Sequence, residues 1–270
     1  MKAVFYITIL FTLFSITSNF AQRLHCPGDE CSFQPGDQVY LFGNDVKLRA
    51  TPNTESKVLE LLKIGEWVEI IEKTDFSWPY NGFDSPFYKV KYDTLTGYIL
   101  GGLLSLERKT MDGTNYFFAY SKNNDALFLN IRNIKDGQYL EQKIPLDNSN
   151  ISIKTHSGKG LPNLDGILLI DYFGEACGVE SGGVYLFSYK NQLQKVAEFS
   201  QISDAGIFYR YEKFIFPDDD GGIPEKILFK KEQKQYLDEE TLWTQTTMET
   251  RQLTWANGQL TPDYRDKSSD

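Results

Sequence analysis

The feature that most limits the fold is a repeated alternation of apolar and polar residues in short runs that end at turn-forming residues. Val46 to Ala50 (VKLRA) and Phe87 to Tyr92 (FYKVKY) place alternate side chains on opposite faces, as half-buried strands do. The chain also contains 19 Phe, 16 Tyr and 4 Trp but only 10 Pro, which favours strands. The sequence therefore predicts an all-β protein.

Residues 38–107 contain enough of these runs for a small closed sheet. Turn clusters such as Thr51 to Ser56 (TPNTES) and Asp93 to Thr94 separate the runs. Several short strands in so short a segment cannot bury one flat face, so we expect them to curl into a barrel. The expected strands cover 46–50, 58–62, 66–71, 87–92, 96–100 and 103–106.

This series of runs resembles the bacterial SH3 family. Five segments are similar to the family's motifs and follow one another in its order: Val46 to Asn53 (VKLRATPN), Ser56 to Leu59 (SKVL), Leu62 to Gly65 (LKIG), Phe87 to Lys91 (FYKVK) and Thr96 to Ile99 (TGYI). The chain departs from the family where Phe87-Tyr88 replaces a Trp-Tyr pair and where residues 74–86 are inserted. The resemblance covers about a quarter of the chain. It implies an SH3-like barrel that docks to peptidoglycan, or to a protein or peptide of the cell envelope.

The inserted residues 74–86 hold the strongest candidates for binding. Pro, Gly, Asn and Asp surround four aromatic residues there, and no strand or helix period is visible, so we expect a loop. Aromatic faces on a loop can stack on sugars or hold a Pro-rich peptide. The alternative is that these side chains fold inward over the barrel end or dock the second domain. The candidate binding residues, with two from neighbouring strands, are Phe76, Trp78, Tyr80, Phe83, Tyr88 and Tyr98.

The first 21 residues have the pattern of a secretory signal peptide. Lys2 supplies a positive charge, Ala3 to Ile16 is almost entirely apolar, and the small Ala21 ends the segment. The apolar run is shorter than the roughly 20 residues that a membrane span needs. We therefore expect cleavage after Ala21, a periplasmic or extracellular protein, and no transmembrane segment in the mature chain.

The charge balance argues against two classes of partner. The chain has 28 Lys and Arg and 37 Asp and Glu, and cleavage removes only Lys2 among these, so the mature balance is 27 minus 37, or −10. An acidic surface repels both nucleic acid and anionic membranes. We expect neither as a partner.

Three cysteines are informative in an oxidising compartment. Cys26 and Cys31 enclose a turn-forming Pro-Gly-Asp-Glu segment, which favours a local disulfide over a zinc pair. Cys177 would then have no disulfide partner, and such a cysteine is more often a buried thiol than a nucleophile.

Residues 108–270 predict a second all-β domain. Strands are expected in sequence order, joined mostly by short Asp, Asn and Gly turns, with Asn257-Gly258 as a hairpin turn. Such a pattern predicts an antiparallel meander that closes as a sandwich or an open barrel. Residues 237–241 (LDEET) can add a short helical turn.

No catalytic constellation is visible in the sequence. No His follows Cys177, two His cannot complete a zinc site, and no nucleophile-elbow or phosphate-binding motif occurs. Asp218 and Asp220 are weak calcium candidates, because an EF-hand-type loop needs ligands at alternating positions. We therefore expect a binding protein without a cofactor. The alternative is a cell-wall or glycan hydrolase with acidic residues such as Asp171 and Glu175 in the C-terminal domain.

The signal-peptide pattern gives the first testable prediction. Protein recovered from outside the cytoplasm should begin at or near Gln22, as read by N-terminal sequencing. A soluble cytoplasmic species that retains Met1 would contradict the expected export.

Overall fold

The computed structural model describes residues 32–135, 137–147, 149–174, 178, 180–190, 192–204, 207–237 and 243–265. Within these residues the chain folds into eighteen strands and one 3-10 turn, so the predicted all-β class is confirmed. None of the described residues forms a helix long and apolar enough to cross a membrane. The expected signal peptide (1–21), Cys26, Cys31, Cys177 and most of the possible helical turn at 237–241 lie outside the described residues.

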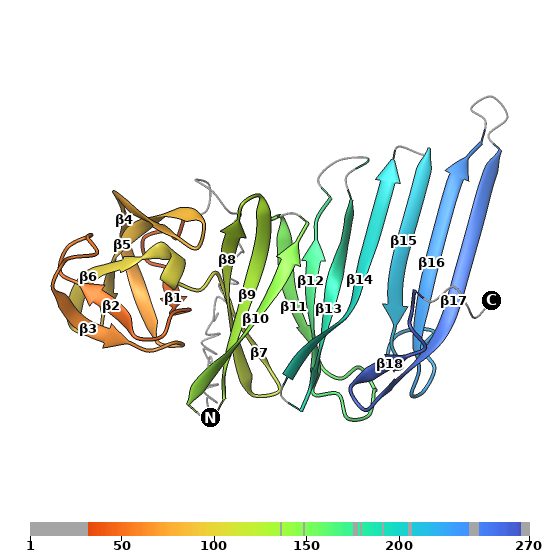
Figure 1. Ribbon diagram of the computed structural model, residues 1–270. Helices are drawn as coiled ribbons and strands as arrows, with labels where there is room; N and C mark the ends of the chain where they lie inside the picture. The colour runs from red at the N-terminus through yellow and green to blue at the C-terminus, as the bar shows by residue number, and fades with distance from the viewer. Residues whose placement is uncertain are drawn as a thin grey trace, which may run out of the picture.

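The first sheet is a strongly curled, six-stranded unit at one end of the molecule (Figure 1). Its strand order is β1-β4-β5-β6-β2-β3, and inward side chains such as Leu48, Val68 and Val90 are fully buried in its core. In β2, Val46 and Leu48 are buried while Lys47 is exposed, as the alternation predicted. Its elements are β1 (Gln38–Tyr40), β2 (Val46–Arg49), β3 (Val58–Leu62), β4 (Trp67–Tyr80), β5 (Phe83–Tyr92), β6 (Leu95–Leu100) and the 3-10 turn η1 (Gly101–Leu103).

The second sheet lies between the barrel and the rest of the chain (Figure 1). Its strands, in the order β10-β9-β8-β7, are β7 (Arg108–Met111), β8 (Thr114–Asn123), β9 (Ala126–Lys135) and β10 (Gln138–Leu146). Residues 116–121 of β8 are all buried. Phe117 packs against Phe42 and Ile64 of the barrel, whereas Phe118 packs on the opposite side against the third sheet. Burial on both faces explains the unbroken apolar run YFFAY, since such a strand needs no polar face.

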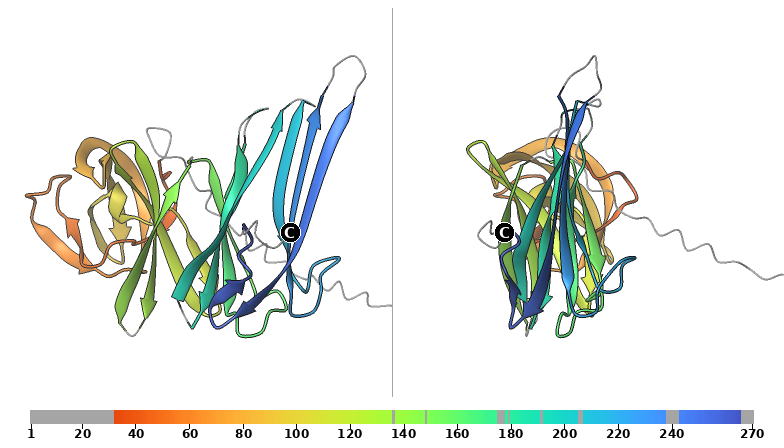
Figure 2. Two further views of the ribbon diagram at one scale, coloured as in Figure 1. Left: turned by 45° about the vertical axis from the view of Figure 1, so that its right-hand side comes forward. Right: turned by 90° about the vertical axis from the view of Figure 1, so that its right-hand side faces the viewer.

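The third sheet contains eight strands in sequence order, which confirms the predicted antiparallel meander. β11 to β13 face the second sheet and share a core with it, so this part is a sandwich. The upper ends of β14 to β17 project beyond it as a single layer (Figure 2). The strands are β11 (Ile151–His156), β12 (Gly166–Tyr172), β13 (Ser181–Tyr189), β14 (Gln192–Asp204), β15 (Phe208–Ile215), β16 (Ile227–Tyr236), β17 (Thr244–Ala256) and β18 (Gln259–Thr261).

An aromatic core covers the lower half of one face of the third sheet. Phe199, Phe214 and Phe229 gather there, and Tyr264 closes over them with ring centroids 5.5 to 6.0 Å away. Tyr264 follows β18, which turns back at Asn257 and Gly258 as predicted. The hairpin β17–β18 and the residues after it therefore supply the cover that the lower half of this face would otherwise lack.

Two contacts from different strands tie the barrel to the second sheet. Arg132 of β9 donates a hydrogen bond of 2.9 Å from Nη1 to the carbonyl oxygen of Phe42, and its guanidinium lies 4.2 Å from the centroid of the Phe42 ring. At the tip of the β4–β5 hairpin, the carbonyl oxygen of Asn81 accepts a hydrogen bond of 2.8 Å from the backbone N–H of Lys122. The hairpin tip is thus held against the turn that joins β8 and β9.

The docked tip generates a prediction about Gly82. Gly82 has a φ of +83°, and a Cβ there would lie 2.1 Å from the carbonyl oxygen of Lys122. Gly113 has a similar φ of +72° but open space around it. An alanine at either position costs about 1–2 kcal/mol for the left-handed backbone, and the clash at Gly82 adds about 1–3 kcal/mol. Urea unfolding should therefore show a clearly larger loss for Gly82→Ala than for Gly113→Ala, and equal losses would show that the tip is not docked.

Candidate functional site

The inserted residues 74–86 form strands, so the expectation of a loop was wrong. β4 and β5 run past the barrel as one long hairpin with a turn at Asn81 and Gly82, both at positive φ. The pairing register shifts between Ile70 and Glu72 and again between Lys73 and Ser77. Bulges of this kind break the two-residue period, which is why the sequence alternation fails here.

The hairpin separates the four aromatic candidates into two pairs. The side chains of Phe76 and Trp78 are 62% and 51% exposed, so both keep free surface. Tyr80 and Phe83 are half-buried near the tip: Tyr80 lies beside η1, and Phe83 packs against the core shared by the second and third sheets. Burial raises the pKa of Tyr80, and the nearby charge of Arg132 opposes this rise. The docking alternative therefore holds for Tyr80 and Phe83 but not for Phe76 and Trp78.

Tyr88 is not available as a binding residue. Its side chain is 1% exposed in the barrel core, and its hydroxyl accepts a hydrogen bond of 3.3 Å from the backbone N–H of Phe33. The sequence pattern itself indicates this burial, because residues two apart in a strand share a face and Val90 is a core residue. Tyr98 of β6 is half-buried and lies opposite Arg49.

The barrel also exposes apolar side chains that the sequence analysis did not select. Trp67 at the start of β4 is 50% exposed, and Leu61 of β3 is 48% exposed. The exposure of Trp67 follows from its position next to Val68, since adjacent residues of a strand point to opposite faces and Val68 is in the core.

The weak calcium candidates do not come together as a cation site. Asp218 and Asp220 are exposed, and their neighbour Asp219 instead forms an ion pair of 2.9 Å with Lys159. Asp219 also accepts a hydrogen bond of 2.9 Å from the backbone N–H of Phe216. Among the described residues, no group of three or more His, Cys, Asp or Glu side chains is arranged to hold a metal ion.

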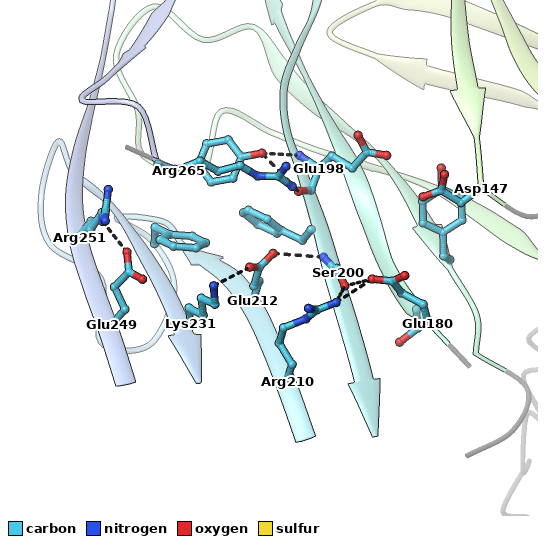
Figure 3. Close-up of a pocket in the computed structure, with 15 residues that line it drawn as sticks. Asp147, Glu180, Glu198, Ser200, Arg210, Glu212, Lys231, Glu249, Arg251 and Arg265 are labelled. Carbon is cyan, nitrogen blue, oxygen red and sulfur yellow. Dashed lines mark hydrogen bonds and ion pairs between the residues drawn. The ribbon is translucent and has the colours of Figure 1, made fainter. Parts of the chain in front are cut away.

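A groove lies on the third sheet, next to the aromatic core formed by Phe199, Phe229 and Tyr264. This groove has a volume of about 890 Å³, and charged side chains from β14 to β17, together with Glu180 just before β13, line it (Figure 3). Arg210 lies 2.9 Å from Glu180, Lys231 lies 3.9 Å from Glu212, and Arg251 forms an ion pair with Glu249. The groove therefore carries pairs of opposite charges rather than a surface of one sign.

Two groups at one end of the groove have raised pKa values. Partial burial raises the pKa of Asp147, and the carboxylates of Glu198 and Glu180 add to the rise. Burial raises the pKa of the Tyr172 phenol to about 12. A carboxyl group with a raised pKa can act as a proton donor. Of the predicted acid pair, Asp171 forms an ion pair with Lys154, and Glu175 lies outside the described residues.

Comparison with known proteins identifies the barrel alone. Residues 44–105 match the family model of the bacterial SH3 domain, which confirms the resemblance found within residues 38–107. No curated protein and no solved structure matches the chain. Bacterial SH3 domains are binding modules that often occur in cell-wall-associated proteins.

The Asp219 ion pair gives a pH-dependent prediction. Partial burial alone would raise the pKa of Asp219, but hydrogen bonds from Lys159 and Phe216 and the charges of Lys159 and His156 outweigh it and lower the pKa. A lowered pKa contributes stability above the unfolded-state value of about 3.9, and this contribution is lost as the pH falls through the folded-state value. At pH 7, Asp219→Asn should therefore cost roughly 1 kcal/mol, and the difference from wild type should vanish at strongly acidic pH.

The neighbouring variant Asp220→Asn is the control for this measurement, because Asp220 is exposed. It should melt like the wild type at every pH. Equal destabilisation by both variants would show that the Lys159 contact does not stabilise the fold.

Proposed function

We propose that this protein is an exported, non-catalytic binding protein whose SH3 domain docks to peptidoglycan or to a protein of the cell envelope. The observation that carries the proposal is the pair of exposed aromatic side chains, Phe76 and Trp78, on the long β4–β5 hairpin of that domain.

The rigidity of the hairpin supports the proposal. Its base belongs to the barrel sheet, and its tip is fixed by the Asn81–Lys122 hydrogen bond and by the packing of Phe83. Binding residues on a fixed strand lose less conformational entropy than residues on a mobile loop. Phe76 and Trp78 thus have fixed positions and exposed side chains that a partner can contact, and the core does not depend on them.

The charge of the chain also bears on how the partner is held. The mature chain, if cleaved after Ala21, carries a net charge of −10 (27 minus 37), so long-range attraction to anionic wall polymers is weak. Affinity must then come from short-range stacking and burial, for which aromatic side chains are well suited.

A hydrolase acting on cell wall or glycan is the second candidate, and the raised pKa of Asp147 favours it. The ion pairs of the groove argue against a hydrolase, because Glu180, Glu212 and Glu249 each lie beside a cationic side chain. Turnover of muropeptides or polysaccharides by the wild type, abolished in Asp147→Asn, would replace the binding proposal with this one.

The proposed function predicts a loss of binding without a loss of stability. Truncating an aromatic side chain at the centre of an interface often costs about 2 kcal/mol or more, which is roughly thirty-fold in affinity. Trp78→Ala should weaken binding to purified peptidoglycan by about this factor, and Phe76→Ala should weaken it in the same direction. The melting temperature of both variants should stay at the wild-type value because both side chains are exposed.

Two further variants make this experiment decisive. Trp243→Ala removes a 69% exposed tryptophan from the C-terminal domain and should bind normally. Tyr80→Ala removes a docked side chain and should lower the melting temperature. Normal binding by both Trp78→Ala and Phe76→Ala would place the site elsewhere, with Trp67 as the next residue to test.

A further inference from the structure

The two faces of strands β15 to β17 carry different arrangements of charge. On the groove face, Arg210, Lys231 and Arg251 each lie beside a glutamate. The opposite face, here called the lysine–tyrosine face, is formed by Tyr209, Tyr211, Lys213, Lys230, Lys234 and Tyr236. Among the described residues, none of its three lysines forms an ion pair.

The strand register places these six side chains on one surface. Tyr209 lies opposite Lys234, and Lys213 lies opposite Lys230, on the adjacent strands β15 and β16. Directly paired residues of an antiparallel sheet point to the same side, and residues two apart along a strand do so too. Residues 244, 246, 248 and 250 of β17 extend the surface with three threonines and an exposed methionine. Among the described residues of β15 to β17, Glu232 is the only acidic residue on this face.

Three lysines against one glutamate give this face a net positive charge. Lys213 and Lys230 are opposite neighbours, and like charges in that position destabilise a sheet. The chain as a whole is acidic, with 37 acidic and 28 basic residues, so carboxylates that could have neutralised this face were abundant. Glu232 offsets only part of the repulsion among the three lysines, and an external polyanion would offset the rest.

The tyrosines give the face a second chemical property. The rings of Tyr209 and Tyr211 are nearly parallel, with an interplanar angle of 11° and centroids 6.2 Å apart. The Nζ of Lys213 lies 5.6 Å from the Tyr211 ring, and the Nζ of Lys234 lies 5.3 Å from the Tyr236 ring. Cations, phenol hydroxyls and ring faces therefore alternate over a flat surface.

We propose that the lysine–tyrosine face binds an acidic polysaccharide. The lysines bind its carboxylate or sulfate groups, and the tyrosines contact its sugar rings and hydroxyls. Three strands about 4.8 Å apart span roughly 10 Å, and five residues along a strand span roughly 13 Å, which is room for a few sugar units of an extended chain. The sheet stands as a single layer at this point, so no other element described by the structure covers the face (Figure 2).

A nucleic acid fits this face less well than a polysaccharide. Proteins that bind duplex DNA commonly neutralise about 6–10 phosphates, whereas this face offers three lysines in an acidic chain. The face also lies at the far end of the molecule from the barrel (Figure 1), so it is separate from Phe76 and Trp78 and does not depend on the function proposed for them.

The full mature chain and a pair of matched polymers test the proposal. Polygalacturonate is the acidic probe, and the same polymer with its carboxylates methyl-esterified is the neutral control. We expect the wild type to bind polygalacturonate in a salt-dependent manner and to bind the esterified polymer at least ten-fold more weakly. Equal binding to both polymers, binding to neither, or tighter binding to a single-stranded oligonucleotide would overturn the proposal.

Adjacent lysines provide the matched variants. Lys230→Gln combined with Lys234→Gln should reduce binding at least ten-fold, and Tyr211→Ala should reduce it several-fold. Lys231→Gln removes one of the chain's positive charges on the opposite, groove face, so binding should be unchanged. Trp78→Ala should also leave this binding unchanged, which separates the face from the barrel site. Equal losses in Lys231→Gln and the double variant would refute the assigned face.

Discussion

The architecture depends on the burial of β8 on both of its faces. Phe117 and Ala119 contact the barrel, while Tyr116, Phe118 and Tyr120 contact the core shared with the third sheet. A strand with one solvated face would leave either the barrel or the meander without a packing partner. Because both neighbours use the same five-residue run, the barrel and the C-terminal sheet are joined through a strand rather than through a linker. The contacts of Arg132 and of the β4–β5 hairpin tip then fix the orientation of the barrel relative to the second sheet.

Much of the fold was readable from the sequence because most strands end at turn residues and keep the two-residue period. The expected strands 46–50, 58–62 and 96–100 correspond to β2, β3 and β6, and the turn at Asn257-Gly258 joins β17 and β18 as expected. The β4–β5 extension was misjudged because two register shifts remove the period in the same place where Pro79 and Gly82 indicate a loop. Tyr88 was wrongly included among the binding candidates, although its spacing of two residues from Val90 places it on the core face.

The parts that could not be predicted are those that depend on pairing between distant residues. Nothing in the run FYRYEKF indicates that Lys213 faces Lys230, since that follows from the register of β15 with β16. The groove on the other face has the same origin, because Arg210, Glu212 and Lys231 meet only once the strands are aligned. A one-residue slip would exchange the two faces, so register alone separates a neutralised surface from a cationic one.

The sequential strand order of the third sheet has a consequence for how this half of the chain folds. Each strand from β11 to β18 pairs only with its neighbours in the sequence, so the sheet needs no long loop closure to form its ladder. Contacts that are local in sequence form quickly, whereas the barrel must bring β1 to β4 and β2 to β6 across intervening strands. The sheet can therefore grow hairpin by hairpin outward from the strands that pack on β8.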